Sequence, residues 1–182
     1  MRQRVRERGG PVDFALFTYW VRVDVRYSDL DTQGVVNNAT YLTYFEHARV
    51  HFFEWLRAGM NASDGTSPHG SAAGGASATE ATGFTAADVP FVLARATCMY
   101  RRPITGLAPV HVGVRCTVAG RATIEMEYVI CDRPNSPNSL ASDVTLYASG
   151  TTTAVCVDAR KGKPRSLPEW ARRALEMRAA EA

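Results

Sequence analysis

The chain of 182 residues is 46% hydrophobic and 21% charged, which fits one soluble domain with its own core and excludes disordered and collagen-like classes. Its formal net charge of +3 is uneven, because residues 1–10 carry +3 and residues 160–182 carry +4, which leaves −4 on the rest. Basic residues confined to the two ends argue against a nucleic-acid partner.

Targeting segments and cysteine pairs are not evident in the sequence. No apolar run is long enough for a membrane-spanning helix, and the charged first residues lack the apolar core and cleavage site of a signal peptide, so no membrane partner is expected. We expect residues 1–14 to form a flexible basic arm. The four cysteines lack C-x-x-C spacing, so we expect free, buried thiols in a cytoplasmic protein. They are Cys98, Cys116, Cys131 and Cys156.

A strand and a helix are predicted near the start of the chain. Residues 19–27 alternate apolar and polar side chains, which predicts a half-buried strand, and a loop rich in Asp, Asn and Gly follows. Residues 40–57 predict a long helix with an apolar stripe at Tyr41, Phe45, Ala48, Phe52 and Trp55. Three further apolar residues widen this stripe, so we expect a mostly enclosed helix: Leu42, Val50 and Phe53.

The next segment has a different composition. Residues 60–88 contain 21 Gly, Ala, Ser or Thr among 29 positions, which predicts a flexible low-complexity insertion rather than a second domain. We therefore expect a single domain over residues 15–168 that contains this insertion. A C-terminal helix and tail over 169–182, with Pro168 in the first turn of the helix, complete the chain.

Four more strands are predicted after the insertion, at 90–102, 109–120, 121–132 and 143–159. Residues 119–121 form a tight hairpin turn, and Gly150 is expected to mark a bulge in the last strand. One early helix followed by antiparallel hairpins indicates an α+β protein, in which one curved sheet surrounds one buried helix.

An acidic cluster lies between the first strand and the helix. Asp29 and Asp31 precede Gly34 and the pair Asn37 and Asn38, at a helix start whose free N–H groups can hold a developing oxyanion. The same residue types are also good turn and N-cap formers, so spacing alone is compatible with a purely structural role.

The segment YSDLDTQGVVNNATYLTYFEHAR at 27–49 resembles the signature D-x-x-G-x-V-x-x-x-x-Y-x-x-x-x-E of hot-dog fold thioesterases. The resemblance is to the 4-hydroxybenzoyl-CoA thioesterase and YbgC-like acyl-CoA thioesterase group, and it covers most of residues 19–168. It implies a five-stranded antiparallel sheet curved around one long central helix. The fixed positions of the signature are Asp31, Gly34, Val36, Tyr41 and Glu46.

By this resemblance Asp31 is the catalytic carboxylate, acting as a nucleophile or as a general base for water. The backbone N–H of Asn38 polarises the thioester carbonyl, and Gly34 shapes the loop. Several YbgC-like members carry a histidine at the position of Asn38, so this chain lacks a second side chain for acid or base chemistry there.

Six further residues are weaker candidates for substrate binding: Tyr41, Glu46, Arg101, Arg102, Lys161 and Lys163. Tyr41 also suits the core, and Glu46 suits a helical ion pair with Arg49. The basic candidates suit the phosphates of coenzyme A or a solvated surface. His47 and His51 share one helix face without a third ligand, so no metal is expected.

The sequence thus predicts a cofactor-independent thioester hydrolase acting on acyl-CoA or acyl-carrier-protein substrates. A single sheet leaves edges exposed, so a homodimer or homotetramer with the pocket at a subunit interface is expected. The alternatives are a non-catalytic acyl-binding hot-dog protein and, less favoured because a pocket histidine motif is missing, a hot-dog dehydratase or hydratase.

Overall fold

The computed structural model describes residues 12–61, 91–133, 144–158 and 160–180. Residues 1–11 and 62–90 contain most of the predicted basic arm and low-complexity insertion, so those two predictions lie outside the described residues. The end of the predicted C-terminal tail, at residues 181–182, also lies outside them.

The described elements follow the predicted order, with short additions. In chain order they are η1 (Phe14–Leu16), β1 (Tyr19–Val23), η2 (Tyr27–Asp29), α1 (Asn38–Asn61), β2 (Phe91–Tyr100), β3 (Val110–Val118), β4 (Thr123–Cys131), β5 (Leu146–Asp158), β6 (Lys163–Pro164) and α2 (Glu169–Ala180). The two 3-10 turns and the two-residue strand β6 were not predicted, because such short elements carry no periodic signal.

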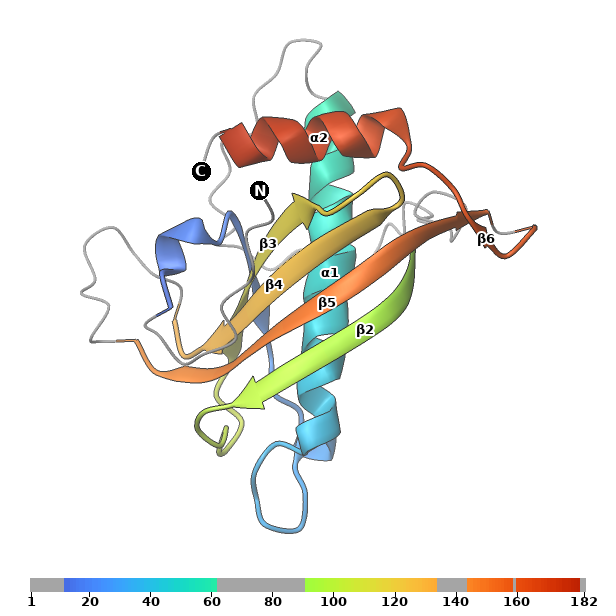
Figure 1. Ribbon diagram of the computed structural model, residues 1–182. Helices are drawn as coiled ribbons and strands as arrows, with labels where there is room; N and C mark the ends of the chain where they lie inside the picture. Colours follow the sequence, from blue (N-terminus) through green and yellow to red (C-terminus); the bar gives the residue numbers. More distant parts are fainter. Residues whose placement is uncertain (1–11, 62–90, 134–143, 159, 181–182) are drawn as a thin grey trace.

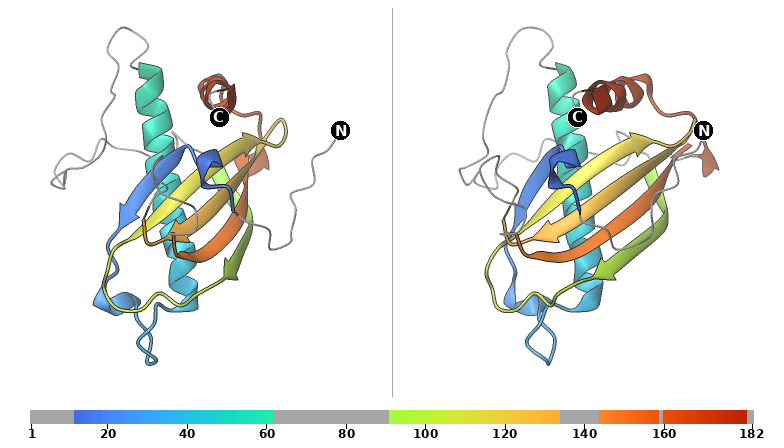
Figure 2. Two further views of the ribbon diagram at one scale, coloured as in Figure 1. Left: turned by 90° about the vertical axis from the view of Figure 1, so that its left-hand side faces the viewer. Right: turned by 60° about the vertical axis from the view of Figure 1, so that its left-hand side comes forward.

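One antiparallel sheet curls around α1, which confirms the predicted α+β hot-dog architecture (Figures 1 and 2). The strand order is β1-β3-β4-β5-β2, with β6 added to the end of β5. Consecutive hairpins join β3 to β4, β4 to β5 and β5 to β6, whereas β2 crosses to the far edge and pairs with β5 instead of β3. The sheet therefore ends on β2 at one side and β1 at the other.

The first strand is shorter than predicted. The alternating pattern extends from residue 19 to residue 27, yet β1 ends at Val23 and a 3-10 turn begins at Tyr27. The carboxylate of Asp29 accepts a hydrogen bond from the Arg26 backbone N–H at 2.9 Å, which satisfies that donor outside the sheet. A local side-chain bond thus overrides the strand pattern.

A side chain of α1 approaches the backbone of the sheet at Gly150. A Cβ atom on this residue would lie 2.4 Å from both the Phe45 ring and the Thr97 carbonyl oxygen. Gly150 pairs in register with Cys98 and with Tyr128, so the predicted bulge is wrong; the register shifts lie at Leu93/Arg95 and at Ile130/Cys131. Glycine is present here because the helix side chain needs the space.

The predicted stripe of α1 faces the sheet, but the helix is less enclosed than expected. Tyr41, Phe45, Ala48 and Phe52 are buried, and Trp55 is half-buried. By contrast, Leu42 and Val50 are 40% and 39% exposed, whereas Phe53 is 2% exposed and belongs to the core. The expectation of an enclosed helix therefore holds for one of the three extra residues, and Leu42 and Val50 leave a partly exposed apolar strip on α1.

The C-terminal helix α2 crosses α1 near its C-terminal end (Figure 1) and contributes Ala174 and Leu175 to the main core. It begins at Glu169, and the Pro168 carbonyl accepts the first helical bond from Arg172, so Pro168 sits at the N-cap. In the described part of the chain, neither helix is long and apolar enough to cross a membrane.

All four cysteines are free, as predicted. Cys131 and Cys156 are fully buried, whereas Cys98 and Cys116 are only half-buried, so the expectation of buried thiols holds for two of the four. Burial raises the pKa of the Cys98 thiol, which keeps it protonated near neutral pH.

Gly150→Ala is expected to destabilise the protein by about 1–3 kcal/mol, since the added methyl group overlaps the Phe45 ring and the Thr97 carbonyl. Urea denaturation at neutral pH measures this loss. Gly120→Ala is the matched control, because its nearest neighbour would be the Thr123 Cβ at 4.0 Å. Equal midpoints for the two variants would show that Phe45 does not need this space.

Candidate functional site

The loop that carries the acidic cluster projects beyond the N-terminal end of α1 (Figure 1). It is closed at a neck formed by Asp29 and Asn37. The Asn37 backbone N–H donates to the Asp29 carbonyl at 2.8 Å, and Leu30 bridges Val36 just inside this neck. The Val36 N–H donates to the Ile104 carbonyl at 3.0 Å. The loop is thus fastened both to itself and to the segment that follows β2.

Asp31 occupies the first position of the turn at the tip of this loop. Its Oδ1 accepts from the Gln33 N–H at 2.7 Å, and its carbonyl accepts from the Gly34 N–H at 3.0 Å. Gly34 has a φ of +74°, a conformation that side chains with a Cβ rarely adopt. The predicted loop-shaping role of Gly34 matches this geometry, and Asp31 remains half-buried with its second oxygen outside the turn.

The helix start leaves one N–H group for a ligand. Asn37 caps α1, since its Oδ1 accepts from the Ala39 N–H and its carbonyl accepts from the Thr40 N–H, both at 2.9 Å. The Asn38 N–H is the first of the helix, so it has no acceptor within α1 and is not engaged by the cap. Asn38 itself borders a pocket, at the end of the helix that carries partial positive charge.

This pocket has a volume of about 200 Å³ and lies between the start of α1 and the end of β2. It brings together four of the predicted residues, namely Asn38, Tyr41, Arg101 and Arg102. The remaining lining residues are Val35, Val36, Tyr100 and Pro103. Asp31 is next to the pocket rather than in its wall, and its N–H donates to the Val35 carbonyl at 2.8 Å.

Tyr41 and Tyr100 form an aromatic corner of the pocket. Their rings meet edge to face with centroids 5.0 Å apart. Tyr41 is buried and its hydroxyl accepts from the Ile104 N–H at 3.3 Å, so it serves both the core and the pocket. The Tyr100 hydroxyl donates to the Asn38 carbonyl at 2.9 Å.

Sequence reasoning did not identify Tyr100 as a site residue. Alternation within 90–102 indicates that Tyr100 shares a face with Cys98, but it does not indicate that this face meets the first turn of α1. That information lies in the pairing of Tyr100 with Ala148, which places β2 on the far side of β5.

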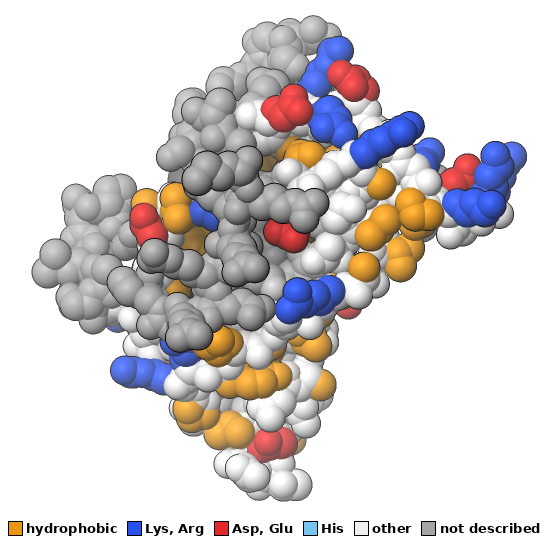
Figure 3. Space-filling view, in the orientation of Figure 1, with side chains coloured by type: hydrophobic (Ala, Val, Ile, Leu, Met, Phe, Trp, Pro, Cys, Tyr) orange, Lys and Arg blue, Asp and Glu red, His pale blue; other side chains and the backbone are white. Residues whose placement is uncertain are grey.

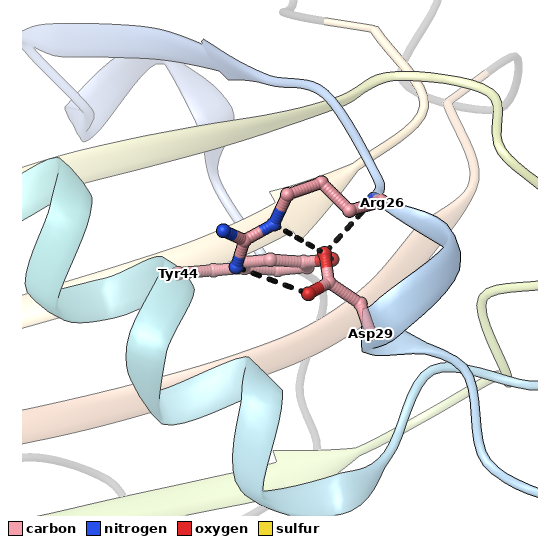
Figure 4. Close-up of polar contacts among 3 residues, drawn as sticks. All are labelled: Arg26, Asp29 and Tyr44. Atoms are coloured by element: carbon pink, nitrogen blue, oxygen red, sulfur yellow. Dashed lines mark hydrogen bonds and ion pairs between the residues drawn. The ribbon is translucent and has the colours of Figure 1, made fainter.

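Asp29, the first carboxylate of the cluster, has a separate environment from Asp31. It is only 4% exposed, and it accepts from the Tyr44 hydroxyl at 2.9 Å and from the Arg26 guanidinium Nη2 at 3.1 Å (Figure 4). Burial alone would raise its pKa, but the bonds from the Arg26 backbone, Tyr44 and the Arg26 side chain outweigh burial and hold the pKa below its usual range. Asp29 is therefore ionised at neutral pH.

The other predicted binding residues lie away from the pocket. Glu46 is exposed on α1 and pairs with Arg49 at 3.7 Å, the helical ion pair that the spacing predicted. Lys161 and Lys163 belong to the hairpin of β5 and β6, where Lys and Arg side chains gather at one side of the molecule (Figure 3). The ten residues of β2 span roughly 30 Å and separate this hairpin from the pocket of the same chain.

His47 and His51 face each other on α1, with ring centroids 4.4 Å apart. Burial, followed by the neighbouring His51, lowers the pKa of His47. His51 pairs with Glu54 at 3.1 Å. Among the residues that the structure describes, no three His, Cys, Asp or Glu side chains are placed to hold a metal ion.

Comparison with protein families supports a single assignment. A family model described as the thioesterase-like superfamily matches residues 25–175, which include the loop, α1 and the whole sheet apart from β1. No curated protein matches the chain.

Solved structures of thioesterases are also similar to this chain. A thioesterase from Thermus thermophilus, complexed with coenzyme A and Zn, is 31% identical over 87% of this chain and 98% of its own, with a TM-score of 0.61. A 1,4-dihydroxy-2-naphthoyl-CoA thioesterase from Synechocystis is 19% identical over 86% and 94%, with a TM-score of 0.58. The probable thioesterase YbaW from Escherichia coli is 21% identical over 86% and 96%, with a TM-score of 0.57.

Asp29→Asn is expected to lower the free energy of unfolding at pH 7 by about 1–3 kcal/mol, since it removes the charge that four hydrogen bonds from Arg26 and Tyr44 engage. Because the native pKa of Asp29 is depressed, its contribution is present above the unfolded pKa of about 4 and is lost as pH falls below it. Urea denaturation between pH 3 and pH 7 should therefore show a shallower acid loss in the variant.

Asp24→Asn is the control for that measurement. Asp24 pairs with Arg22 at 2.7 Å, but its side chain is 71% exposed, so the change in stability should be smaller at every pH. An acid dependence that is the same in Asp29→Asn as in the unmodified chain would contradict the ionised state of Asp29.

Proposed function

The chain belongs to the thioesterase-like superfamily, and on that premise we propose that it hydrolyses acyl-CoA or acyl-carrier-protein thioesters to a free acid and a thiol, with Asp31 as the catalytic carboxylate. The resemblance of residues 27–49 to hot-dog thioesterases is thereby confirmed at the level of the family. The observation that carries the proposal is the position of Asp31 beside a pocket that is lined by Asn38, the first residue of a long helix.

In this mechanism the Asn38 N–H donates to the thioester carbonyl oxygen. Its charge develops in the tetrahedral transition state, where a fixed donor at a helix N-terminus is most effective. The Tyr100 hydroxyl holds the Asn38 carbonyl at 2.9 Å, so the peptide that precedes Ala39 is supported on its carbonyl side. This arrangement agrees with a backbone role for Asn38 and requires nothing of its side chain.

Asp31 then acts on the thioester carbon or on a water molecule. One oxygen stays in the turn with the Gln33 N–H at 2.7 Å, which leaves the other for attack on the carbonyl carbon or for removal of a proton from water. Attack by the carboxylate forms a mixed anhydride and expels the thiolate, and water then releases the acid. Attack by activated water reaches the same products in one displacement.

A non-catalytic acyl-binding protein is the second candidate. The specific observation in its favour is the Asx turn at Asp31, because an aspartate whose Oδ1 accepts from a backbone N–H two residues later already has a structural role. The pocket and helix N-terminus would then bind an acyl thioester without reacting.

Arg101 and Arg102 are proposed to hold phosphate groups of the substrate. Both are exposed and border the pocket directly after β2. Their backbone N–H groups donate to the Tyr147 carbonyl at 2.8 and 3.1 Å, which fixes the chain while the guanidinium groups stay at the surface. Guanidinium groups bind phosphates through paired hydrogen bonds, and both coenzyme A and the prosthetic arm of a carrier protein carry phosphate.

The pocket is proposed to be completed by a second copy of the chain. Its volume of about 200 Å³ is below the roughly 300–1,000 Å³ usual for ligand sites. It opens beside β2, an edge strand whose Val92, Leu93 and Met99 are 54%, 43% and 47% exposed, and apolar side chains lie along this side of the molecule (Figure 3). Such an edge favours pairing with another strand.

Antiparallel pairing of two β2 edges also accounts for Lys161 and Lys163. The pairing brings the Phe91 end of one copy to the Tyr100 end of the other, and Phe91 pairs with Cys156 next to the basic hairpin. The hairpin of one copy would thus approach the pocket of its partner and could contact substrate phosphates there. A homodimer is the minimal assembly, and a homotetramer contains the same pair.

Asp31→Asn is expected to lower kcat by about 10²–10⁴-fold, because an amide is neither a nucleophile nor a base for water. Release of free thiol from a panel of aromatic and aliphatic acyl-CoA and acyl-carrier-protein thioesters measures it. The amide oxygen still accepts from Gln33, so the turn is retained. Asp13→Asn is the control, since Asp13 makes an equivalent turn with the Ala15 N–H at 3.1 Å.

Two results would count against this assignment. Full activity in Asp31→Asn would remove Asp31 from the mechanism even if hydrolysis is observed. Binding of acyl-CoA without release of thiol by the unmodified chain would favour the acyl-binding protein.

The unmodified chain is expected to have at least twice the mass of one chain in light scattering after size exclusion. Val92→Lys places a charge on the β2 edge and should shift the protein toward a monomer and reduce hydrolysis. Leu107→Lys is the matched control, because Leu107 is 55% exposed and lies in the loop before β3. A monomeric unmodified chain with full hydrolysis would contradict the shared pocket.

A further inference from the structure

We propose that Asp29 and Tyr44 form a clamp that positions the Asp31 loop against the N-terminus of α1, so that Asp29 is a positioning residue for the reaction. This inference rests on the proposed function only for its kinetic consequence. The clamp itself consists of contacts within the described residues. Its members are the carboxylate of Asp29, the hydroxyl of Tyr44 and the guanidinium and backbone N–H of Arg26 (Figure 4).

Asp29 lies at the neck of the loop. Its carbonyl accepts from the Asn37 N–H at 2.8 Å, and the chain between these two residues makes the whole excursion to the tip. Asp31 is two residues after one side of the neck, and Asn38 is one residue after the other side. A shift of Asp29 therefore changes the position of the carboxylate relative to the Asn38 N–H.

A hydrogen bond from Tyr44 attaches this neck to the helix α1. The Tyr44 hydroxyl donates to Asp29 Oδ2 at 2.9 Å, and Tyr44 is 2% exposed on the buried face of α1. Tyr44 lies six residues after Asn38, so the bond fixes the loop to the body of the helix rather than to its first turn, where helices fray. The Tyr44 ring is held by the core, which makes it a stable anchor.

Arg26 balances the negative charge of Asp29 within the clamp. Arg26 donates from its backbone N–H at 2.9 Å and from Nη2 at 3.1 Å, so a buried carboxylate is neutralised by a neighbour three residues earlier. Charge-assisted bonds are stronger and more directional than neutral ones. Asp29 thus joins η2 to α1 through its carboxylate and closes the loop neck through its backbone carbonyl, while Asp31 stays available for substrate.

Positioning of this kind acts on kcat more than on KM. Displacement of a reacting group by about 1 Å costs up to roughly 10²-fold in rate, while most substrate contacts remain. The pocket wall itself, formed by Tyr41, Tyr100 and the residues after β2, does not include Asp29 or Tyr44. Loss of the clamp should therefore slow the chemistry without weakening substrate binding.

The test is Tyr44→Phe, which keeps the ring and removes the hydroxyl bond to Asp29. We expect kcat to fall roughly tenfold with KM unchanged, and amide hydrogen exchange in peptides that cover residues 27–40 to become faster. Tyr128→Phe is the matched control, because Tyr128 is also buried and its hydroxyl lies 3.0 Å from Thr152 Oγ1. This control should leave both kcat and exchange in the loop unchanged.

Asp31→Asn is measured in parallel to separate this proposal from the proposed function. If Asp31→Asn retains activity, the catalytic assignment fails, yet faster exchange in Tyr44→Phe alone still supports the clamp. Equal exchange in Tyr44→Phe and Tyr128→Phe overturns the clamp, and faster exchange with an unchanged kcat overturns its positioning role. If Tyr44→Phe does not fold, Arg26→Gln tests the same carboxylate through a side chain that is 68% exposed.

Discussion

The depth at which α1 lies in the curled sheet depends on the contact between Phe45 and Gly150. A single methyl group at Gly150 would overlap the ring, so the helix and sheet approach each other more closely here than side chains with a Cβ allow. The Phe45 ring also stacks on Tyr128 with centroids 4.6 Å apart, which connects the helix to β4 as well as β5. Because Asn38 lies seven residues before Phe45, this contact also sets where the helix N-terminus meets Tyr100.

The two carboxylates of the acidic loop differ in burial and bonding, which separates the structural role of Asp29 from the chemical role proposed for Asp31. Asp29 accepts four hydrogen bonds from Arg26 and Tyr44 and has almost no exposure, so its charge is fully used within the fold. Asp31 is two residues away, but only one of its oxygens is engaged, by a backbone N–H. A carboxylate whose two oxygens both accept hydrogen bonds is a poor nucleophile, whereas a carboxylate with a free oxygen beside a pocket keeps its reactivity. The role of each aspartate therefore follows from its partners rather than from its residue type.

Local periodicity predicts the elements of this chain, but not how they meet. Alternation located five strands, and the apolar stripe located α1 to within four residues at its end, because both signals depend only on neighbouring positions. The placement of β2 beyond β5 and the space at Gly150 depend on pairings between residues that are far apart in the sequence, such as Tyr100 with Ala148 and Cys98 with Gly150. The clamp at Asp29 and the site role of Tyr100 were missed for the same reason, since their partners Tyr44 and Asn38 become neighbours only through the fold.

Charge and exposure together support the proposal that a second copy of the chain completes the pocket. The body between the basic ends carries −4, yet the rim of the pocket presents Arg101 and Arg102, and the basic hairpin of β5 and β6 is roughly 30 Å away on the same chain. On α1, Leu42 lies within about 20° of Phe53 around the helix axis, and Phe53 stacks on Phe91 of β2. The exposed strip of the helix and the free strand edge thus share one side of the molecule. A partner on this side would cover the apolar strip and close the pocket in the same step, so stability and site formation would depend on one interface.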